Sequence, residues 1–384
     1  MLSPLLPLGI LEKSTFADVP PDFRAAYQSI LLAEANASLG KQSKQQNGDK
    51  MTPRNPATDL IHARVLGHLL KELFDNKSIL GNKPARILVQ KIGRLGNDSD
   101  EGIYDLGKVY RWILLRCFRC NRRNNLPSPE PLRSFDTLRG TVDDVLETTI
   151  DSEGAKKKAL LRDGFRCTLS KAYDMKSCKQ NNDLFMMARE APDVGWVPTV
   201  CCPIIPDSTI EFFENGEKMS RPVGVLCARA FGLEDLDGTF SQANGIHDLR
   251  NVFTISEALY AFFDYLELWL ENTKNPEQVN EYTICAHESW LIPKPYQKLI
   301  GQVVRFEVSD MVPSERKEEF SESLPDPRLL TLHAICARVM HMSGAENDAD
   351  DSDICILAND GSDVQALQER LELVAMLSEI VAAR

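Results

Sequence analysis

Two cysteines, Cys117 and Cys120, have the two-residue separation with which paired thiolates bind zinc. A structural zinc site needs four ligands, and the sequence contains no second CxxC pair and no HxxxH pair to complete one. Both thiols also fall within an apolar pattern of helical period at residues 105–120. We therefore expect these two side chains to pack in the core.

Several other chemical motifs are missing from the sequence. It has no GxGxxG loop, no Walker lysine loop and no nucleophile elbow, so nucleotide-dependent transfer and α/β-hydrolase chemistry have no support. Asp235, Asp237 and Gly238 resemble the start of a calcium-binding loop, but the ligand needed at its twelfth position is absent. None of these patterns predicts a function.

Four ordered blocks are more informative. They read RDGFRCTLS at 162–170, TVCCPIIPDS at 199–208, NGIHDLRNVFTISEALYAFFDYLELWLE at 244–271 and LPDPRLLTLHAICARVMHMSGA at 324–345. Together they resemble the HNH-endonuclease-type domain found in many fungal proteins, over about residues 156–345. The resemblance implies a core of a hairpin and a helix, the ββα type, which holds a divalent metal against the scissile phosphate.

This chain departs from that family at two reactive positions. The family has a general-base histidine where this sequence has Pro203, which carries no titratable group, and a metal-binding histidine where it has Tyr260. A neutral phenol, with a pKa of about 10, is a poor ligand for Mg²⁺ or Zn²⁺. Of the three named positions only Asn251 keeps the family's residue. We expect the ordinary HNH mechanism to be absent.

The resemblance places two further residues near the altered site. His247 lies four residues before Asn251, and Cys202 immediately precedes Pro203. A thiolate and an imidazole suit zinc, although a buried strand cysteine and an exposed loop histidine explain the same residues without metal. Asn251, Tyr260 and His247 are the candidate catalytic residues, and Cys202, Pro203 and Tyr260 are the degenerate motif positions. No cofactor and no bound metal are expected.

Three functions follow from this reading. The first is a degenerate HNH-nuclease-like protein without ordinary metal-dependent phosphodiesterase activity, which acts in binding or regulation. The second is an HNH-like scaffold recruited as an enzyme for a small apolar metabolite in a fungal biosynthetic pathway, with Tyr260 as proton donor and Trp196 and Phe263 in the pocket. The third is an active nuclease with substituted ligands.

Charge is distributed unevenly along the 384 residues. The chain has 44 Lys and Arg against 56 Asp and Glu, but residues 104–179 contain sixteen basic and ten acidic residues. The basic residues cluster from Arg111 to Arg123 and from Lys156 to Lys179, which makes nucleic acid a possible partner. A small-molecule ligand is the other candidate partner. No stretch is apolar enough to span a bilayer and the ten cysteines are too dilute for a disulfide scaffold, so we expect an intracellular protein, cytoplasmic or nuclear.

These residues need elements to position them, and the apolar patterns predict an α+β fold. We expect a helical N-terminal region at 1–134, an HNH-nuclease-like domain at 135–345, and an acidic loop and closing helix at 346–384. The predicted helices are 22–39, 57–74, 105–120, 155–163, 223–231, 252–270, 327–342 and 364–384. The predicted strands are 166–170, 197–205, 281–286 and 302–308. Loops or linkers are predicted at 40–56, 121–134 and 232–248.

Overall fold

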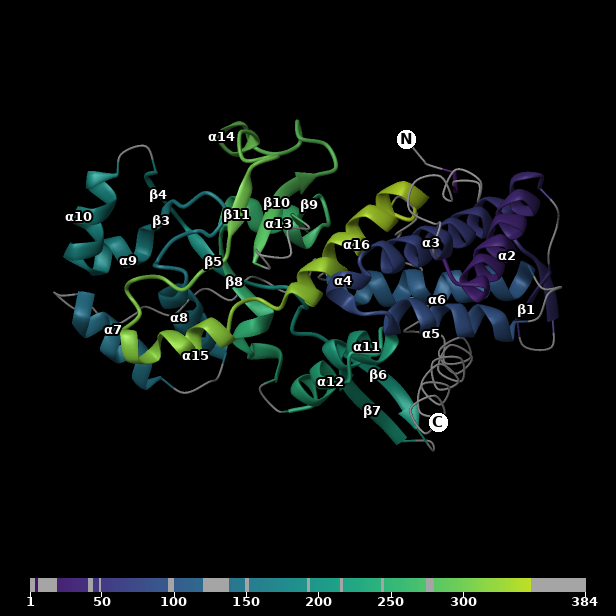
Figure 1. Cartoon of the computed structure of the whole chain (residues 1–384), viewed down its shortest axis with the longest axis horizontal. Coiled ribbons are helices and arrows are strands. Elements are labelled where there is room, and N and C mark those ends of the chain that lie inside the picture. The colour runs from purple at the N-terminus through teal and green to yellow at the C-terminus, as the bar shows by residue number, and fades with distance from the viewer. Residues whose placement is uncertain are drawn as a thin grey trace. The chain divides into compact units, whose positions relative to one another are not determined.

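The computed structural model describes the chain at residues 4–5, 19–40, 44–47, 50–95, 100–119, 138–148, 152–191, 194–214, 217–242, 245–273 and 280–346. These residues form a mixed structure of helices and strands, in which helix predominates (Figure 1). The predicted mixture of α and β elements is therefore confirmed, whereas the HNH-type core stays a prediction.

Contacts between residues divide the chain into two compact units. The first contains Met1–Cys117, Thr209–Asp237 and Ile335–Arg384, and the second contains Phe118–Ser208 and Gly238–Ala334. Each unit is therefore made from segments that are distant in sequence. The domain limits expected after residues 134 and 345 stay predictions.

The first unit is mainly helical. Its helices are α2 (Pro21–Ser38), α3 (Pro56–Asp75), α4 (Lys77–Leu80), α5 (Lys83–Arg94), most of α6 (Asp100–Phe118), α11 (Val223–Ala230), the start of α12 (Glu234–Phe240) and the end of α16 (Pro327–Ser343). Its strands form two antiparallel hairpins, β1 (Lys44–Asn47) with β2 (Lys50–Pro53) and β6 (Thr209–Glu214) with β7 (Glu217–Pro222). Helices α2, α3 and α5 pack against one another.

Helix α3 shows why the sequence folds as a helix here. The side chain of Asn55 accepts a hydrogen bond from the Ala57 N–H at 3.0 Å, and Pro56 occupies the first helical position, where its missing N–H costs nothing. Leu66, Leu69 and Leu73 recur at helical spacing and are fully buried. A capped start and a wide apolar stripe therefore specify this element locally.

Helix α6 approaches α3 closely at Gly107. A Cβ there would lie 2.2 Å from the His62 carbonyl oxygen, so we expect Gly107→Ala to lower the free energy of unfolding by about 1–3 kcal/mol, despite the higher helix propensity of alanine. The matched control is Gly93→Ala on α5, where a Cβ meets nothing within 4 Å. That variant is expected to gain about 0.5–1 kcal/mol. Urea unfolding of both full-length variants measures this, and equal gains would contradict the close approach.

The second unit mixes short helices with small sheets. Its helices are α7 (Leu138–Glu147), α8 (Ser152–Arg162), α9 (Met175–Gln180), α10 (Asn182–Glu190), α13 (Glu257–Asp264), α14 (Lys294–Gln297) and α15 (Lys317–Glu322), together with the end of α12 and the start of α16. Its 3-10 turns are η1 (Gly245–His247), η2 (Leu249–Asn251) and η3 (Ser314–Arg316). Its strands are β3 (Tyr173–Asp174), β4 (Trp196–Val197), β5 (Thr199–Pro203), β8 (Val252–Ser256), β9 (Leu268–Asn272), β10 (Glu281–Ala286) and β11 (Val303–Arg305).

Three sheets hold these strands, and the pairing of β5 with β8 matters most for the site. Strands β9, β10 and β11 form an antiparallel sheet with β10 in the middle, and β3 pairs in parallel with β4. Strand β5 runs antiparallel to β8, with Cys202 opposite Phe253 and Pro203 opposite Val252. Helix α13 starts directly after β8 and packs on both strands.

A buried apolar cluster lies in the second unit. It consists of side chains from α7 to α10 and from the segments around β3 and α15: Val142, Val145, Leu161, Phe165, Tyr173, Cys178, Leu184, Ala188, Val312 and Phe320. Phe165 belongs to the first block, so that block contributes to the core of the unit.

Most of the predicted helices are confirmed, and one is wrong. The helices expected at 22–39, 57–74, 105–120, 155–163, 223–231 and 327–342 correspond to α2, α3, α6, α8, α11 and α16. Residues 252–270, expected as one long helix, instead form β8, α13 and β9. All five residues of β8 are buried, so its apolar run fits a helix and a strand equally well, and Leu266 ends the helical segment with a φ of 63°.

Other sequence expectations are corrected by the structure. Residues 166–170 are mostly turn, with one bridge between Arg166 and Tyr173, because the nearby Gly164, Phe165 and Lys171 have left-handed backbone angles. The loops expected at 40–56 and 232–248 contain the β1–β2 hairpin and α12, whose polar composition concealed them. The strands expected at 197–205 and 281–286 are confirmed as β4–β5 and β10, and only 303–305 of the strand expected at 302–308 is extended. The expected linker 121–134 and closing helix 364–384 lie outside the described residues, as does most of the acidic segment 346–363.

Candidate functional site

The candidate site lies where β5 ends and β8 begins. Because the two strands are antiparallel, the carboxyl end of β5 meets the start of β8, and the Ile204 N–H donates to the Asn251 carbonyl oxygen at 2.7 Å. Pro203 and Asn251 are thereby brought to the same end of the strand pair. Helix α13, which carries Tyr260, begins at the other end of β8.

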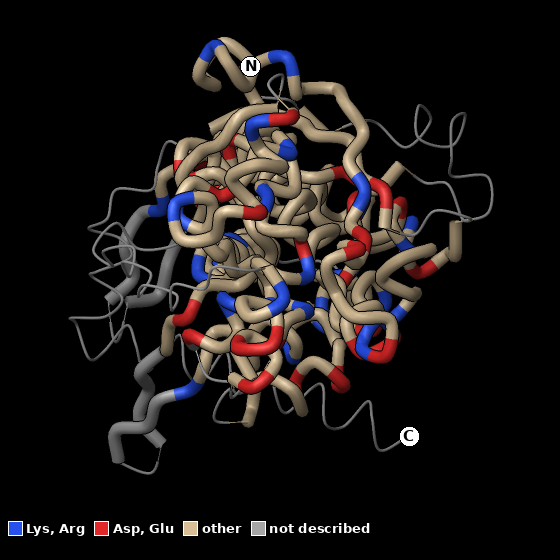
Figure 2. Tube along the Cα trace, turned by 90° about the vertical axis from the view of Figure 1, so that its left-hand side faces the viewer, with Lys and Arg blue, Asp and Glu red and all other residues tan. Residues whose placement is uncertain are grey.

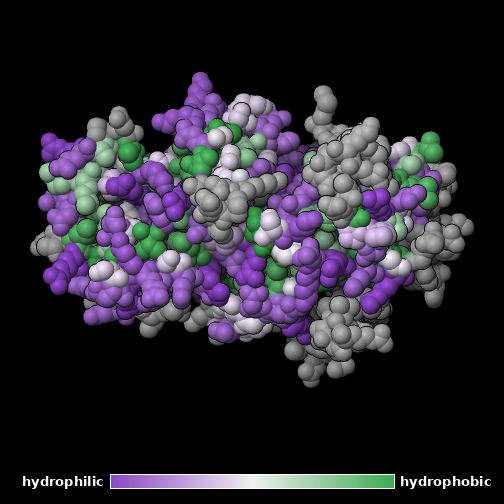
Figure 3. Space-filling view, in the orientation of Figure 1, coloured by the Kyte–Doolittle hydropathy of each residue, from purple (hydrophilic) through white to green (hydrophobic). Residues whose placement is uncertain are grey.

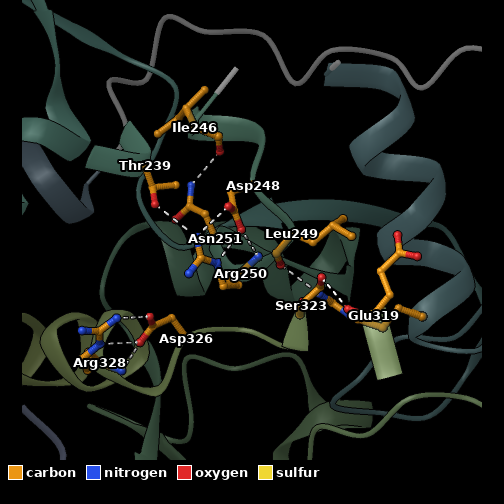
Figure 4. Close-up of polar contacts among 11 residues, drawn as sticks. Thr239, Ile246, Asp248, Leu249, Arg250, Asn251, Glu319, Ser323, Asp326 and Arg328 are labelled. Atoms are coloured by element: carbon orange, nitrogen blue, oxygen red, sulfur yellow. Dashed lines mark hydrogen bonds and ion pairs between the residues drawn. The ribbon is translucent and has the colours of Figure 1, made fainter. Parts of the chain in front are cut away.

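Asn251 is 1% exposed, and its side chain is occupied by backbone groups. Its Oδ1 accepts from the Ile205 N–H at 2.9 Å, while Nδ2 donates to the carbonyl oxygens of Ile205 and Ile246 at 2.9 and 3.0 Å. Both amide donors are used in this way. Figure 4 shows the side chain pointing toward Ile246. Asn251 therefore ties the segment after β5 to turn η1.

An arginine and an aspartate flank Asn251 on the same turn. The Asp248 carboxylate accepts from the Arg250 N–H at 2.8 Å and forms an ion pair with the Arg250 guanidinium at 2.9 Å. The guanidinium also donates to the Thr239 hydroxyl at 3.1 Å (Figure 4). These contacts fix the η2 turn by a side-chain cap and a local ion pair, so both charges have a structural use.

The first block of the sequence supports this turn through a buried ion pair. The Arg162 side chain is completely buried and pairs with Asp163, its Nε lying 2.8 Å from Oδ1. The Arg162 guanidinium also donates to the carbonyl oxygens of Leu249 at 2.9 Å and Val252 at 2.8 Å, on either side of Asn251. Sequence reasoning placed Arg162 in a family block and missed this role, since its acceptors are 87 and 90 residues away.

Residues 166–171 form a turn that attaches to β8. Thr168 donates from both its N–H and its hydroxyl to the Thr254 carbonyl oxygen, at 2.9 and 2.8 Å. The Cys167 sulfur accepts from the N–H groups of Ser170 and Ser256, at 3.4 and 3.2 Å. Cys167 therefore has the structural place that is expected of a buried thiol.

The adjacent cysteines of β5 do not provide an activated thiolate pair. Burial raises the pKa of the Cys201 thiol to about 12, which keeps it protonated at neutral pH. Cys202 is fully buried opposite Phe253, and its sulfur lies 3.6 Å from the Pro203 carbonyl oxygen. Among the described residues, neither Cys202 nor His247 belongs to a set of three or more metal-ligating side chains whose ligand atoms lie within 4.8 Å of one another.

His247 and Tyr260 occupy different parts of the site. His247 lies on η1, next to the Ile246 carbonyl that Asn251 binds, and its Nε2 is 3.9 Å from the Asp207 carboxylate. Tyr260 is half-buried on α13, beside the fully buried Leu259. The structure thus brings His247, Asn251 and Pro203 to the same end of the strand pair, while β8 separates them from the start of the helix that carries Tyr260.

A buried histidine on α16 supports α13. The His333 ring stacks on Phe263 with a centroid distance of 3.8 Å, and its Nε2 donates to the Phe263 carbonyl oxygen at 3.1 Å. Burial lowers the pKa of His333 to about 3, so the ring is neutral. This histidine packs against the helix and hydrogen-bonds to it.

These donors do not fit a divalent ion of the HNH type. The positions where the resemblance expects the general base and the metal ligand carry Pro203 and the phenol of Tyr260. The Asn251 amide is hydrogen-bonded to backbone groups, and the neighbouring Cys201 thiol is protonated.

Elsewhere, Cys117 is buried on α6 and packs in the core as expected, whereas Cys120 lies outside the described residues. Figure 2 shows Lys and Arg residues interspersed with Asp and Glu residues along the trace.

Comparison of the chain with family models, with curated proteins and with solved structures finds no match. Among the described residues, no helix combines the length and the apolar character that are needed to cross a membrane. The HNH resemblance therefore rests on the four sequence blocks and stays a prediction.

Proposed function

We propose that this chain is a degenerate HNH-nuclease-like protein that binds nucleic acid and does not hydrolyse it. The order of elements supports the proposal, because an antiparallel strand pair, β5 and β8, is followed directly by a helix that packs on both. This order is compatible with a ββα unit, in which the resemblance expects the reactive residues to lie, although β5 and β8 are separated in sequence by β6, β7, α11 and α12 and do not form one hairpin.

The main support for an absence of phosphodiester hydrolysis is that the Asn251 side chain is hydrogen-bonded to backbone groups. Hydrolysis of a phosphodiester needs a group that deprotonates water and a cation or donor that stabilises the developing charge. At the expected base position Pro203 offers neither, and the Asn251 amide donates only to Ile205 and Ile246. The segment around Asn251 therefore builds a turn that can present a surface.

A plasmid assay tests the absence of hydrolysis. Supercoiled plasmid incubated with the full-length protein and Mg²⁺, Mn²⁺ or Zn²⁺ is expected to show no nicking above buffer, because a proline stands where the resemblance expects the general base. The same protein is expected to retard the plasmid in a gel at low salt, with retardation that weakens as salt rises. An active HNH nuclease is the positive control.

Matched variants make the outcome decisive. His247→Ala and Tyr260→Phe remove the two candidate catalytic groups without touching the buried contacts of Asn251. Metal-dependent nicking by the wild type that either variant abolishes would overturn the proposal and favour an active nuclease with substituted ligands. Absence of any plasmid retardation would overturn the nucleic-acid part. The small-molecule enzyme stays a prediction, which the nicking assay does not address.

A further inference from the structure

Helix α10 exposes large apolar side chains in the second unit. Phe185, Met186 and Met187 are 38, 41 and 40% exposed, and Trp196 on β4 is 44% exposed. Apolar side chains are visible over α10 among polar ones in Figure 3. Leu184 and Ala188, on the opposite side of the same helix, are buried in the apolar cluster. The middle of the helix is therefore apolar on its solvent side as well, which is unusual for a helix without a partner.

The two exposed aromatic rings form one stacked pair. The centroids of Phe185 and Trp196 are 5.9 Å apart and their planes are inclined by 28°. Both rings are attached to ordered elements: Trp196 pairs through its backbone with Tyr173 in the β3–β4 bridge, and the side chain of Asn181 caps α10 at the Leu184 N–H. A flat aromatic surface held in this way needs little ordering when a planar ligand stacks on it.

Three basic side chains lie on, or next to, the elements that carry or contact this aromatic pair. Lys171 lies two residues before Tyr173, Lys179 is on α9, which packs against α10 and β4, and Arg189 is on α10. All three are exposed, and none has an ion-pair partner among the described residues. The nearby carboxylate of Asp183 already accepts from the Leu138 N–H at 2.9 Å. Among the residues that the structure describes, these three cations are therefore not paired with a carboxylate, although Asp183 and Glu190 also lie on α10.

We propose that Phe185 and Trp196 are a stacking platform for the bases of single-stranded nucleic acid, with Lys171, Lys179 and Arg189 on its phosphates. The inference rests on the proposed function. It adds that the nucleic acid is single-stranded and that this surface binds it. Stacking requires an unpaired base with an open π-face, and a duplex hides those faces. The combination of exposed rings with cations that form no ion pair among the described residues favours a nucleic acid over an apolar protein surface, which would leave the cations without counter-charge.

Fluorescence anisotropy with a labelled 20-nucleotide oligo-dT and a matched 20-base-pair duplex tests the platform. The full-length wild type is expected to bind the single strand more tightly than the duplex. Trp196→Ala and Phe185→Ala are each expected to weaken single-strand binding by about tenfold or more, with little effect on the duplex. Lys171→Ala combined with Lys179→Ala is expected to weaken both and to reduce the salt slope by about 0.7 per lost phosphate contact.

Trp290→Ala is the matched control, since Trp290 is 70% exposed in the same unit and lies outside the platform. It is expected to bind both oligonucleotides as the wild type does, and far-UV circular dichroism checks that each variant is folded. Wild-type affinity in Trp196→Ala and Phe185→Ala would overturn the platform and leave the proposed function standing.

Two other outcomes also overturn the platform. Binding of neither oligonucleotide by the wild type would remove the proposed function together with it. Self-association that Trp196→Ala abolishes, without oligonucleotide binding, would assign the surface to a second copy of this chain.

Discussion

Replacement of Arg162 by methionine is expected to lower the free energy of unfolding by about 3–5 kcal/mol, which for many domains would abolish folding. The variant leaves the Asp163 carboxylate, whose side chain is 2% exposed, without its counter-charge. It also removes the donors to the carbonyl oxygens of Leu249, Val252 and Ser323. Methionine is similar in length to arginine and fills most of its volume. The decrease in the free energy of unfolding therefore reflects lost polar contacts more than the creation of a cavity.

Two comparisons sharpen the experiment. Arg166→Met alters a neighbouring arginine of the same block, which stacks over the Tyr173 ring at 3.9 Å and is half-buried, and it is expected to cost only about 0.5–1 kcal/mol. Arg162→Lys keeps the charge but cannot reproduce the fork of donors, so it is expected to be nearly as damaging as methionine. Urea unfolding followed by circular dichroism measures all three. A loss below about 1 kcal/mol in Arg162→Met would show that the pair does not support the site.

Asn251→Ala is expected to lower the free energy of unfolding by about 3–5 kcal/mol. The change leaves the Ile205 N–H without its acceptor and the Ile205 and Ile246 carbonyl oxygens without a donor, in a region where Asn251 is almost completely buried. Asn182→Ala, at an exposed position on α10, is the control and is expected to change stability by less than about 0.5 kcal/mol. Urea unfolding distinguishes the two, and equal effects would contradict the proposed role.

Asn251→Asp provides a pH-dependent version of the same test. Its ionised carboxylate would face two carbonyl oxygens, so the folded state favours the protonated acid and its pKa rises above the unfolded value of about 3.9. The folded state then binds more protons than the unfolded state, and stability falls as pH rises above about 4. Unfolding of the wild type and this variant at several pH values measures the difference. Parallel pH profiles would show that the amide donors do not matter.

The sequence predicted elements well where local pattern is sufficient. The stripe of Leu66, Leu69 and Leu73 specifies α3 by itself, because a helix needs only its own periodicity and a cap. Residues 252–270 failed because Val252 and its neighbours in β8 are buried on both sides, and their pattern becomes a strand only through pairing with β5. The paired residues of β5 and β8 lie about fifty residues apart in the chain, so the pattern within a short stretch of sequence does not reveal the pairing.

The sequence predicted which residues lie at the candidate site, but not which hydrogen bonds they make. The sequence pointed to Asn251 and to the unusual Pro203, and the structure places both at the same end of the strand pair. It did not show that the Asn251 amide is consumed by Ile205 and Ile246, or that Arg162 holds both flanks of this residue. Those facts depend on burial and on long-range geometry, which residue types and spacing do not encode.

The reach of Arg162 has a consequence for biosynthesis. Its guanidinium binds a carbonyl oxygen of Ser323, 161 residues later in the chain. At a translation rate of about 5–20 residues per second, that acceptor leaves the ribosome at least about 8 seconds after the arginine. During this interval the guanidinium stays hydrated and the surrounding segments lack their final hydrogen bond. The second unit therefore cannot complete its interior until about 8 seconds or more after Arg162 has been synthesised.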